Sequence, residues 1–352
     1  MAASGSLARV ARGACLLLAA LVAGPASGLQ PGDVLIPRNN SGGALIRLDP
    51  RSGVIDVFVD LGAEVDPVDL AVEAEGDFFV LDDGGFAGQR IVRVFRDGSG
   101  FDPLTEDFTL EDVEGITLLE GRLYGVRDEF IGDPLETPLF FEIDTTSGAV
   151  LPILTKADFE STHPPSSVDD LEAAKGDTAG PTCGSGPAED FVVWTEPSRR
   201  LLTRVPISGA CIARFPGSGQ PQLSSSPVGL ELRGGIAVVG LRSGELASLT
   251  MDDGEIVGTL GVDLGWVNDL EFDTLTQRYY SLDRIARLLK AIDPQTGAVE
   301  ASWDLAGHNV ANKFEVVPSF VWGEIPAAPA PARALLALAF FTALALEAHR
   351  RR

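Results

Sequence analysis

The sequence has few of the residues that most often carry catalysis or bind transition metals. Its 352 residues include only three histidines, His163, His308 and His349, and three cysteines. Neither Cys183 nor Cys211 has a histidine nearby at the spacing of zinc ligands, so a zinc site is not expected. The sequence contains no nucleophile elbow, HExxH motif, Walker loop or dinucleotide fingerprint. The usual sequence evidence for hydrolases and nucleotide-dependent enzymes is therefore missing.

Basic residues are also scarce. Lysine and arginine total 27 against 51 aspartate and glutamate, which gives a formal net charge of −24. Nucleic acid is not an expected partner, because phosphate contacts need clustered lysine and arginine. The 45% of hydrophobic and 22% of charged residues are ordinary for a globular protein and exclude wholesale disorder. A strongly acidic protein can bind divalent cations or cationic partners, or its charge can simply keep it solvated in salty surroundings. Solvation is the commonest explanation.

Residues 1–28 are typical of a secretory signal peptide. Arg9 and Arg12 give a basic start, residues 14–23 are apolar, and residues 24–28 are small and suited to cleavage. The apolar run is too short to span a bilayer. The alternative, a buried N-terminal helix, is disfavoured because no polar face recurs at helical spacing. We therefore expect an exported protein.

Export also bears on the cysteines. Cys15 would be removed with the signal peptide, leaving Cys183 and Cys211 on either side of a loop rich in glycine, proline and serine. An even pair in an oxidising compartment predicts a disulfide between them. Two free thiols are the alternative.

The C-terminal end carries a second sorting element. A Pro/Ala-rich spacer covers residues 319–332, and residues 333–352 hold an apolar helix and a terminal arginine cluster. This arrangement resembles the bacterial PEP-CTERM class of sorting signals, with Glu324-Ile325-Pro326 in place of Pro-Glu-Pro. The resemblance implies an exosortase-type sorting enzyme as a partner and a cell-surface or extracellular protein, anchored transiently or stably in the membrane by this transmembrane helix. A plain tail anchor is the alternative.

The body between the two ends consists of short strand patterns. A phrase of strand, Asp, turn, Gly and strand recurs at 44–54, 140–150 and 290–299. The aspartate accepts hydrogen bonds from the turn and the glycine supplies a left-handed conformation, so each phrase predicts a hairpin. A second phrase, Gly or Asp followed by a short apolar strand, precedes the hairpins. Its copies are 69–72, 115–118, 170–173, 229–232 and 269–272.

Each unit thus holds four strands over roughly 40 to 50 residues, the period of a β-propeller blade. We predict an all-β fold at 29–318, a β-propeller of six four-stranded blades, closed by the C-terminal strand 313–317 pairing with the three strands of 33–61. Such pairing hides two sheet edges. A propeller of five or seven blades is the alternative, because the fourth blade has an insert at 176–188. The other blades are expected at about 67–108, 113–155, 168–216, 227–262 and 266–305.

The phrase Ile-Asp-Pro-x-Thr-Gly at 292–297 and the start Pro-Val-Asp-Leu-Ala-Val at 67–72 resemble the NHL and SMP-30/gluconolactonase-like propellers. Inner strands begin around one mouth of the central channel, and four of the six residues at these starts carry side-chain oxygen. The six residues are Val68, Glu114, Asp169, Val228, Asn268 and Asn312. The resemblance implies one divalent ion, such as Ca²⁺, bound by Glu114, Asp169, Asn268 and Asn312, since hard cations prefer carboxylate and amide oxygens. Ordinary polar lining of a wet channel mouth is the more usual explanation.

A second acidic series follows two or three residues further along the inner strands. These residues are Glu172, Glu231, Glu271 and Glu315. Buried without partners they would be costly, so we expect cations, arginines or channel water beside them.

Two functions remain. The first is a surface-associated binding or scaffold module for a protein, polysaccharide or ion of the envelope or extracellular matrix. The second is a divalent-metal-dependent, lactonase-like hydrolase at the channel mouth, in which the metal polarises a carbonyl oxygen and Asp169 or a neighbouring acid acts as base. Catalytic residues are otherwise unassigned, and residues 29–318 carry a formal charge of −28. The first function is the better supported, because no nucleophile is evident.

Overall fold

The computed structural model describes residues 29–318, except for ten gaps. These are 40–41, 73–75, 85–87, 106–109, 111, 129–133, 161–166, 175–188, 218 and 262. The predicted signal peptide, spacer and C-terminal helix lie outside the described residues, as do His163 and Cys183. Among the residues that are described, no helix has the length and apolar character needed to cross a membrane.

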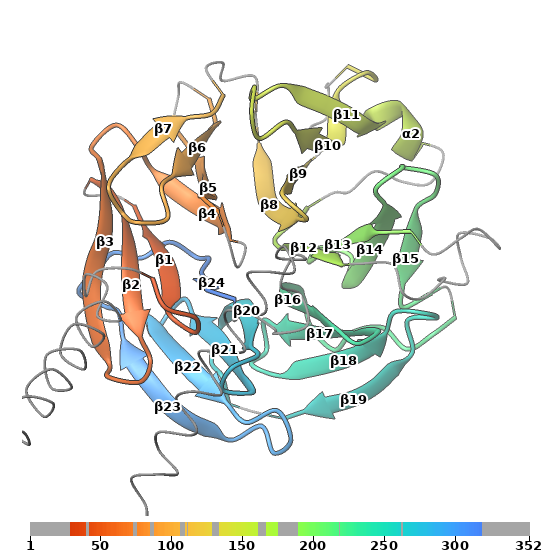
Figure 1. Cartoon of the computed structure of the whole chain (residues 1–352). Coiled ribbons are helices and arrows are strands. Elements are labelled where there is room, and N and C mark those ends of the chain that lie inside the picture. The colour runs from red at the N-terminus through yellow and green to blue at the C-terminus, as the bar shows by residue number, and fades with distance from the viewer. Residues whose placement is uncertain are drawn as a thin grey trace, which may run out of the picture. The chain divides into compact units, whose positions relative to one another are not determined.

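Six four-stranded antiparallel sheets surround a central axis (Figure 1). The predicted six-bladed β-propeller is confirmed. Blade 1 contains β24 (Glu315–Val316), β1 (Val34–Arg38), β2 (Gly43–Asp49) and β3 (Val54–Gly62). Blade 2 contains β4 (Pro67–Ala71), β5 (Phe78–Asp82), β6 (Arg90–Val94) and β7 (Phe101–Pro103). Blade 3 contains β8 (Val113–Leu119), β9 (Arg122–Arg127), β10 (Pro138–Ile143) and β11 (Val150–Thr155), followed by the short helix α2 (Lys156–Glu160).

The other three blades repeat this order. Blade 4 contains β12 (Leu171–Ala174), β13 (Phe191–Glu196), β14 (Leu201–Pro206) and β15 (Ala213–Phe215). Blade 5 contains β16 (Pro227–Arg233), β17 (Ile236–Leu241), β18 (Leu246–Thr250) and β19 (Ile256–Leu260). Blade 6 contains β20 (Val267–Asp273), β21 (Arg278–Asp283), β22 (Leu288–Ile292) and β23 (Val299–Asp304).

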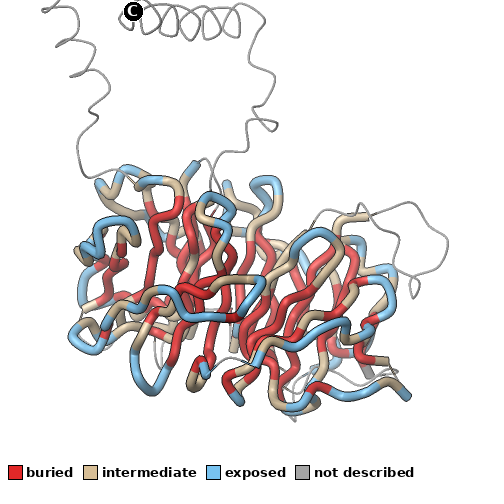
Figure 2. The backbone as a smooth tube through the Cα atoms, turned by 90° about the horizontal axis from the view of Figure 1, so that it is seen from below, coloured by how far each residue is buried: buried red, intermediate tan, exposed pale blue. Residues whose placement is uncertain are grey.

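The hydrophobic core lies between blades. Each of the six apolar clusters joins side chains from two neighbouring blades, as where Tyr124 and Phe140 of blade 3 pack with Trp194 of blade 4. Strands such as β5 and β13 are therefore buried along their whole length, because both faces of these sheets are covered. Figure 2 shows the buried backbone in the strands and the exposed backbone in the turns. Packing between sheets, with little helix, holds the ring together.

Strands from both ends of the described chain complete blade 1. β24 pairs antiparallel with β1, with Val316 opposite Val34 and Glu315 opposite Leu35. Two further backbone hydrogen bonds join Val317 to Gly32 and Asp33, at 2.9 and 2.8 Å. The predicted closure is thus confirmed, although the ladder is shorter than 313–317.

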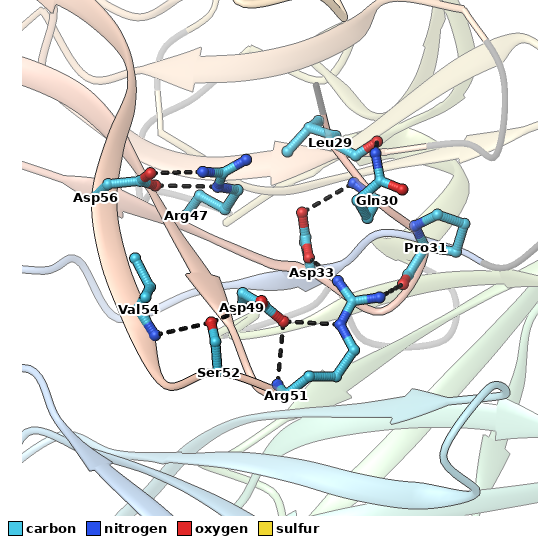
Figure 3. A network of polar contacts seen from close by, with 10 residues as sticks. All are labelled: Leu29, Gln30, Pro31, Asp33, Arg47, Asp49, Arg51, Ser52, Val54 and Asp56. Carbon is cyan, nitrogen blue, oxygen red and sulfur yellow. Dashed lines mark hydrogen bonds and ion pairs between the residues drawn. The ribbon is translucent and has the colours of Figure 1, made fainter. Parts of the chain in front are cut away.

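The hairpin turn of blade 1 is tied to the start of the described chain (Figure 3). Asp49 accepts hydrogen bonds from the backbone N–H of Arg51 and the hydroxyl of Ser52, at 3.0 and 2.7 Å. Gly53 closes the turn at φ 72°, as the hairpin phrase predicts. The guanidinium of Arg51 also contacts the buried carboxylate of Asp33 at 2.6 Å. This ion pair fixes the segment that leads into β1.

Strand direction gives the disk two distinct faces. We call the face where the inner strands β4, β8, β12, β16, β20 and β24 begin the start face, and the opposite one the end face. Turns between second and third strands lie on the start face. Turns between third and fourth strands lie on the end face, together with residues 29 and 318, because β1 leaves that face and β24 runs toward it.

Candidate functional site

The channel side chains form three layers, and the first is the predicted ligand set at the start face. Four inner strands, β4, β8, β16 and β20, carry a bulge here, between residues 67 and 69, 113 and 115, 227 and 229, and 267 and 269. A bulge breaks the strict alternation of side chains along a strand. It therefore re-aims two successive residues, such as Asn268 and Asp269, at the place where the blades meet.

The structure brings the four predicted ligands to this mouth in two pairs from neighbouring blades. The Asn268 amide donates a hydrogen bond to the backbone carbonyl of Asn312 at 2.7 Å. Glu114 and Asp169 lie close enough for their charges to interact. Burial, followed by the nearby carboxylates, raises the pKa of Glu114 to about 7. Burial also raises the pKa of Asp169 to about 6, although Lys313 and Arg242 act against it.

These oxygen donors fit a hard divalent ion by type. Asp169 is also engaged by a guanidinium, because Arg242 lies 3.6 Å from its carboxylate. Among the described residues, Glu114 and Asp169 belong to no cluster of three or more acidic, histidine or cysteine ligand atoms. A metal at this mouth stays a prediction.

The second layer is a buried ammonium surrounded by aspartates. From blade 2 round to blade 1, the aligned residues of the inner strands alternate between aspartate and a residue of another type. They are Asp69, Gly115, Asp170, Gly229, Asp269 and Lys313. Each aspartate accepts a backbone N–H of the next inner strand, from Ile116, Leu230 and Phe314, at 2.9, 2.6 and 2.7 Å. We call this arrangement the Lys313 clasp.

The glycines of the clasp leave room for the neighbouring strand. A Cβ atom on Gly229 would lie 2.7 Å from the backbone nitrogen of Leu270, and one on Gly115 would lie 3.0 Å from the Cβ of Leu171. A larger residue would crowd β8 against β12 or β16 against β20, the neighbouring inner strands that no aspartate of the clasp joins.

The sixth position of the clasp holds the cation. Lys313 Nζ lies 2.6 Å from Asp170 Oδ1, with both side chains buried. Burial alone would lower the pKa of Lys313, but Asp170, Asp269 and Asp69 together raise it above its ordinary value. Burial raises the pKa of Asp69 to about 7 even though Lys313 opposes this. The clasp fastens three inner strands to their neighbours and places one positive charge among three acidic side chains.

The third layer, toward the end face, is the second acidic series. Carboxylate oxygens of Glu172, Glu271 and Glu315 all lie within 4.8 Å of one another. These residues and Glu231 line a pocket of about 190 Å³, to which Thr117 also contributes. Glu231 accepts a hydrogen bond from the backbone N–H of Phe272 at 3.0 Å. This glutamate layer brings carboxylates from four inner strands to one pocket.

A further pocket, of about 250 Å³, opens on the start face where blade 6 meets blade 1. Its walls carry Arg284 and Arg287 together with Asn39, Asn309 and Asn312. Arg287 donates to the amide oxygen of Asn309 at 3.3 Å. The pocket thus brings two guanidinium groups together beside Asp283 on an acidic body. Sequence reasoning missed this pocket, because its residues lie in turns of different blades.

Comparisons with known proteins give a fold likeness alone. No protein-family profile matches the chain, and no curated protein matches it in sequence. The chain resembles one from the crystal structure of a nidogen/laminin complex, with 11% identity and a TM-score of 0.58, over 82% of this chain and 99% of that one. It also resembles a Bacteroides caccae protein of unknown function, with 15% identity and a TM-score of 0.56, over 81% and 98% of the two chains.

Proposed function

We propose that this protein is an exported, surface-associated β-propeller that binds a protein partner in the envelope or extracellular matrix through its start face. The observation that carries the proposal is the likeness of the whole propeller to a chain solved in a protein–protein complex. Residues 1–28 and 319–352, with their signal-like and sorting-like patterns, support export and surface retention.

The start-face pocket supports the same proposal. Arg284 and Arg287 are exposed there, and a planar guanidinium can hold a carboxylate with two parallel hydrogen bonds. A protruding loop of a partner that carries an acidic side chain would therefore fit this pocket. Binding would use fixed turns on a rigid ring, with little loss of conformational freedom.

The test compares two exposed arginines that occupy equivalent turns of different blades. Arg284 lies between β21 and β22, and Arg200 lies between β13 and β14. The purified protein is crosslinked to proteins of the source envelope fraction, and captured partners are quantified by mass spectrometry. Arg284→Glu should lose the specific partner, whereas Arg200→Glu should retain it. Equal capture by both variants would refute binding through the pocket, and the lack of any saturable partner would refute the proposed function.

The alternative is a metal-dependent, lactonase-like hydrolase, favoured by the oxygen donors gathered at the channel mouth. In that function Glu114, Asp169, Asn268 and Asn312 would hold the ion, which would polarise a carbonyl oxygen, and Asp169 would act as base. Lactone hydrolysis that requires Ca²⁺ or Mn²⁺ and is abolished by Glu114→Gln would favour the enzyme over the binding module.

A further inference from the structure

The glutamate layer differs from the rest of the molecule in how its charges are balanced. In the Lys313 clasp, an ammonium and backbone N–H groups compensate three aspartates. Among the described residues, no lysine, arginine or histidine forms an ion pair with Glu172, Glu271 or Glu315, and none of the three carboxylates accepts a hydrogen bond. Burial without such partners is strongly unfavourable for charged groups.

Glu271 shows the lack of compensation most clearly. It is 9% exposed and is one of nine buried acidic residues in the described part of the chain. The other eight all accept hydrogen bonds, from backbone N–H groups, hydroxyls or basic side chains. These eight are Asp33, Asp69, Asp82, Asp170, Glu196, Asp269, Asp273 and Asp283. Glu271 alone has no such partner, and its carboxylate is directed at those of Glu172 and Glu315.

The three glutamates come from three different inner strands, so they lie together only when the ring of blades is assembled. Glu172 lies on β12, Glu271 on β20 and Glu315 on β24. Each stands two residues beyond a member of the Lys313 clasp, namely Asp170, Asp269 or Lys313, so the clasp fixes the height of all three carboxylates in the channel. Ligands held in this way are preorganised.

We propose that Glu172, Glu271 and Glu315 bind one divalent cation that closes the end-face side of the channel. The donors are all oxygens, which selects a hard cation. Ca²⁺ coordinates oxygen at about 2.3–2.6 Å, so two of its ligands on opposite sides stand roughly 4.6–5.2 Å apart. The spacing of the three glutamates falls within that reach. Mg²⁺ needs a tighter octahedron and keeps more of its water, so the geometry favours Ca²⁺.

The surrounding pocket can complete the coordination. Its volume of about 190 Å³ has room for several waters, each of which needs about 30 Å³. Glu231 and Thr117 line the same space and can hold such waters. This site differs from the predicted one at the start face in its ligands and in the face of the ring on which it lies. Its role is structural: it would join blades 4, 6 and 1 across the channel.

The experiment titrates Ca²⁺ into the metal-free purified protein by calorimetry and follows the melting temperature in parallel. We expect a saturable Ca²⁺ site that raises the melting temperature, with Mg²⁺ binding more weakly. In the double variant Glu271→Gln/Glu315→Gln, the site should weaken by at least about tenfold, because charge count tunes calcium affinity. Without metal the same variant should melt higher than the wild type, since it removes repulsion between carboxylates. Misfolding of the variant is therefore not the expected outcome.

The matched control is Glu114→Gln/Asp169→Asn, which removes two charges at the start face and should keep the end-face ion. If the calorimetric site that is lost in the glutamate variant is also lost in this control, Ca²⁺ binds the acidic surface in general and the proposal is overturned. It would also be overturned if the glutamate variant melts higher than the wild type but neither protein responds to Ca²⁺. In that case the glutamates share protons instead of a metal ion.

Discussion

Replacing Lys313 by methionine isolates what the clasp contributes to stability. Methionine keeps most of the length and apolar volume of lysine but removes the ammonium that lies 2.6 Å from Asp170. Removing one partner of a buried ion pair costs about 3–5 kcal/mol, because the other charge stays behind without compensation. For a domain of this size, 1 kcal/mol corresponds to roughly 2 °C. We therefore expect the melting temperature to fall by about 6–10 °C.

The loss should depend on pH in a defined direction. The folded-state pKa of Asp69 is raised to about 7, chiefly by burial, and removing Lys313 takes away a charge that lowers it. A carboxyl whose folded pKa exceeds its unfolded value binds more protons in the folded state. Its contribution to stability is therefore present at low pH and is lost as the pH rises through the folded pKa. The variant should lose less stability near about pH 5 than near about pH 8.

Calorimetric or denaturant unfolding of metal-free protein at both pH values measures this difference. Arg278→Met is the control, because Arg278 pairs with a single exposed carboxylate, that of Glu300, on the surface of blade 6. We expect that variant to lose about 1 kcal/mol or less. If Lys313→Met melts like the wild type, or loses the same stability at both pH values, the ammonium does not compensate the buried aspartates.

Three further outcomes are expected. Deleting 313–317 should open the ring and unfold the body cooperatively, and an unchanged melting temperature would contradict closure by that segment. Mass spectrometry of the unreduced exported protein should show Cys183 linked to Cys211, and labelling of both as free thiols would end that prediction. At the start face, millimolar Ca²⁺ should bind with a Kd of about 10⁻⁴ to 10⁻³ M and raise the melting temperature. Glu114→Gln/Asp169→Asn should remove that one ion. If the variant binds as many Ca²⁺ ions as the wild type, no metal binds at this channel mouth.

Much of the fold could be predicted because its signals are local. The turn at Asp49–Gly53 needs an acceptor and a left-handed glycine, and both residues are visible in the sequence. The same pairing recurs at Asp144 and Gly148, where a Cβ would lie 2.1 Å from the carbonyl oxygen of Leu104. Repetition of such turns gives the blade period, and the unpaired strand near residue 315 then predicts the closure.

The site was harder to predict because it depends on the relation between strands distant in the chain. The bulge before Asp269 cannot be recognised in one sequence, and it decides which side chains turn toward the channel. Lys313 occupies a position where the other blades have aspartate or glycine, so a signal existed in the aligned inner strands. The role of Lys313 became clear only from its contact with Asp170, which lies 143 residues away in the chain. The glutamate series was visible, but the meeting of Glu172, Glu271 and Glu315 was not.

The shared blade also makes the chain a candidate for circular permutation. Gly32 and Val317 are hydrogen-bonded to each other at 2.9 Å, so a short linker could join residues 29 and 318 without crossing the ring. New ends could then be opened in the connection between β3 and β4, at the exposed residues Ala63 and Glu64. In that permutant β24, β1, β2 and β3 would follow one another in a single stretch of chain. The ring would then close by side-chain packing between blades 1 and 2, so its stability relative to the native order would measure what strand exchange between the two ends contributes.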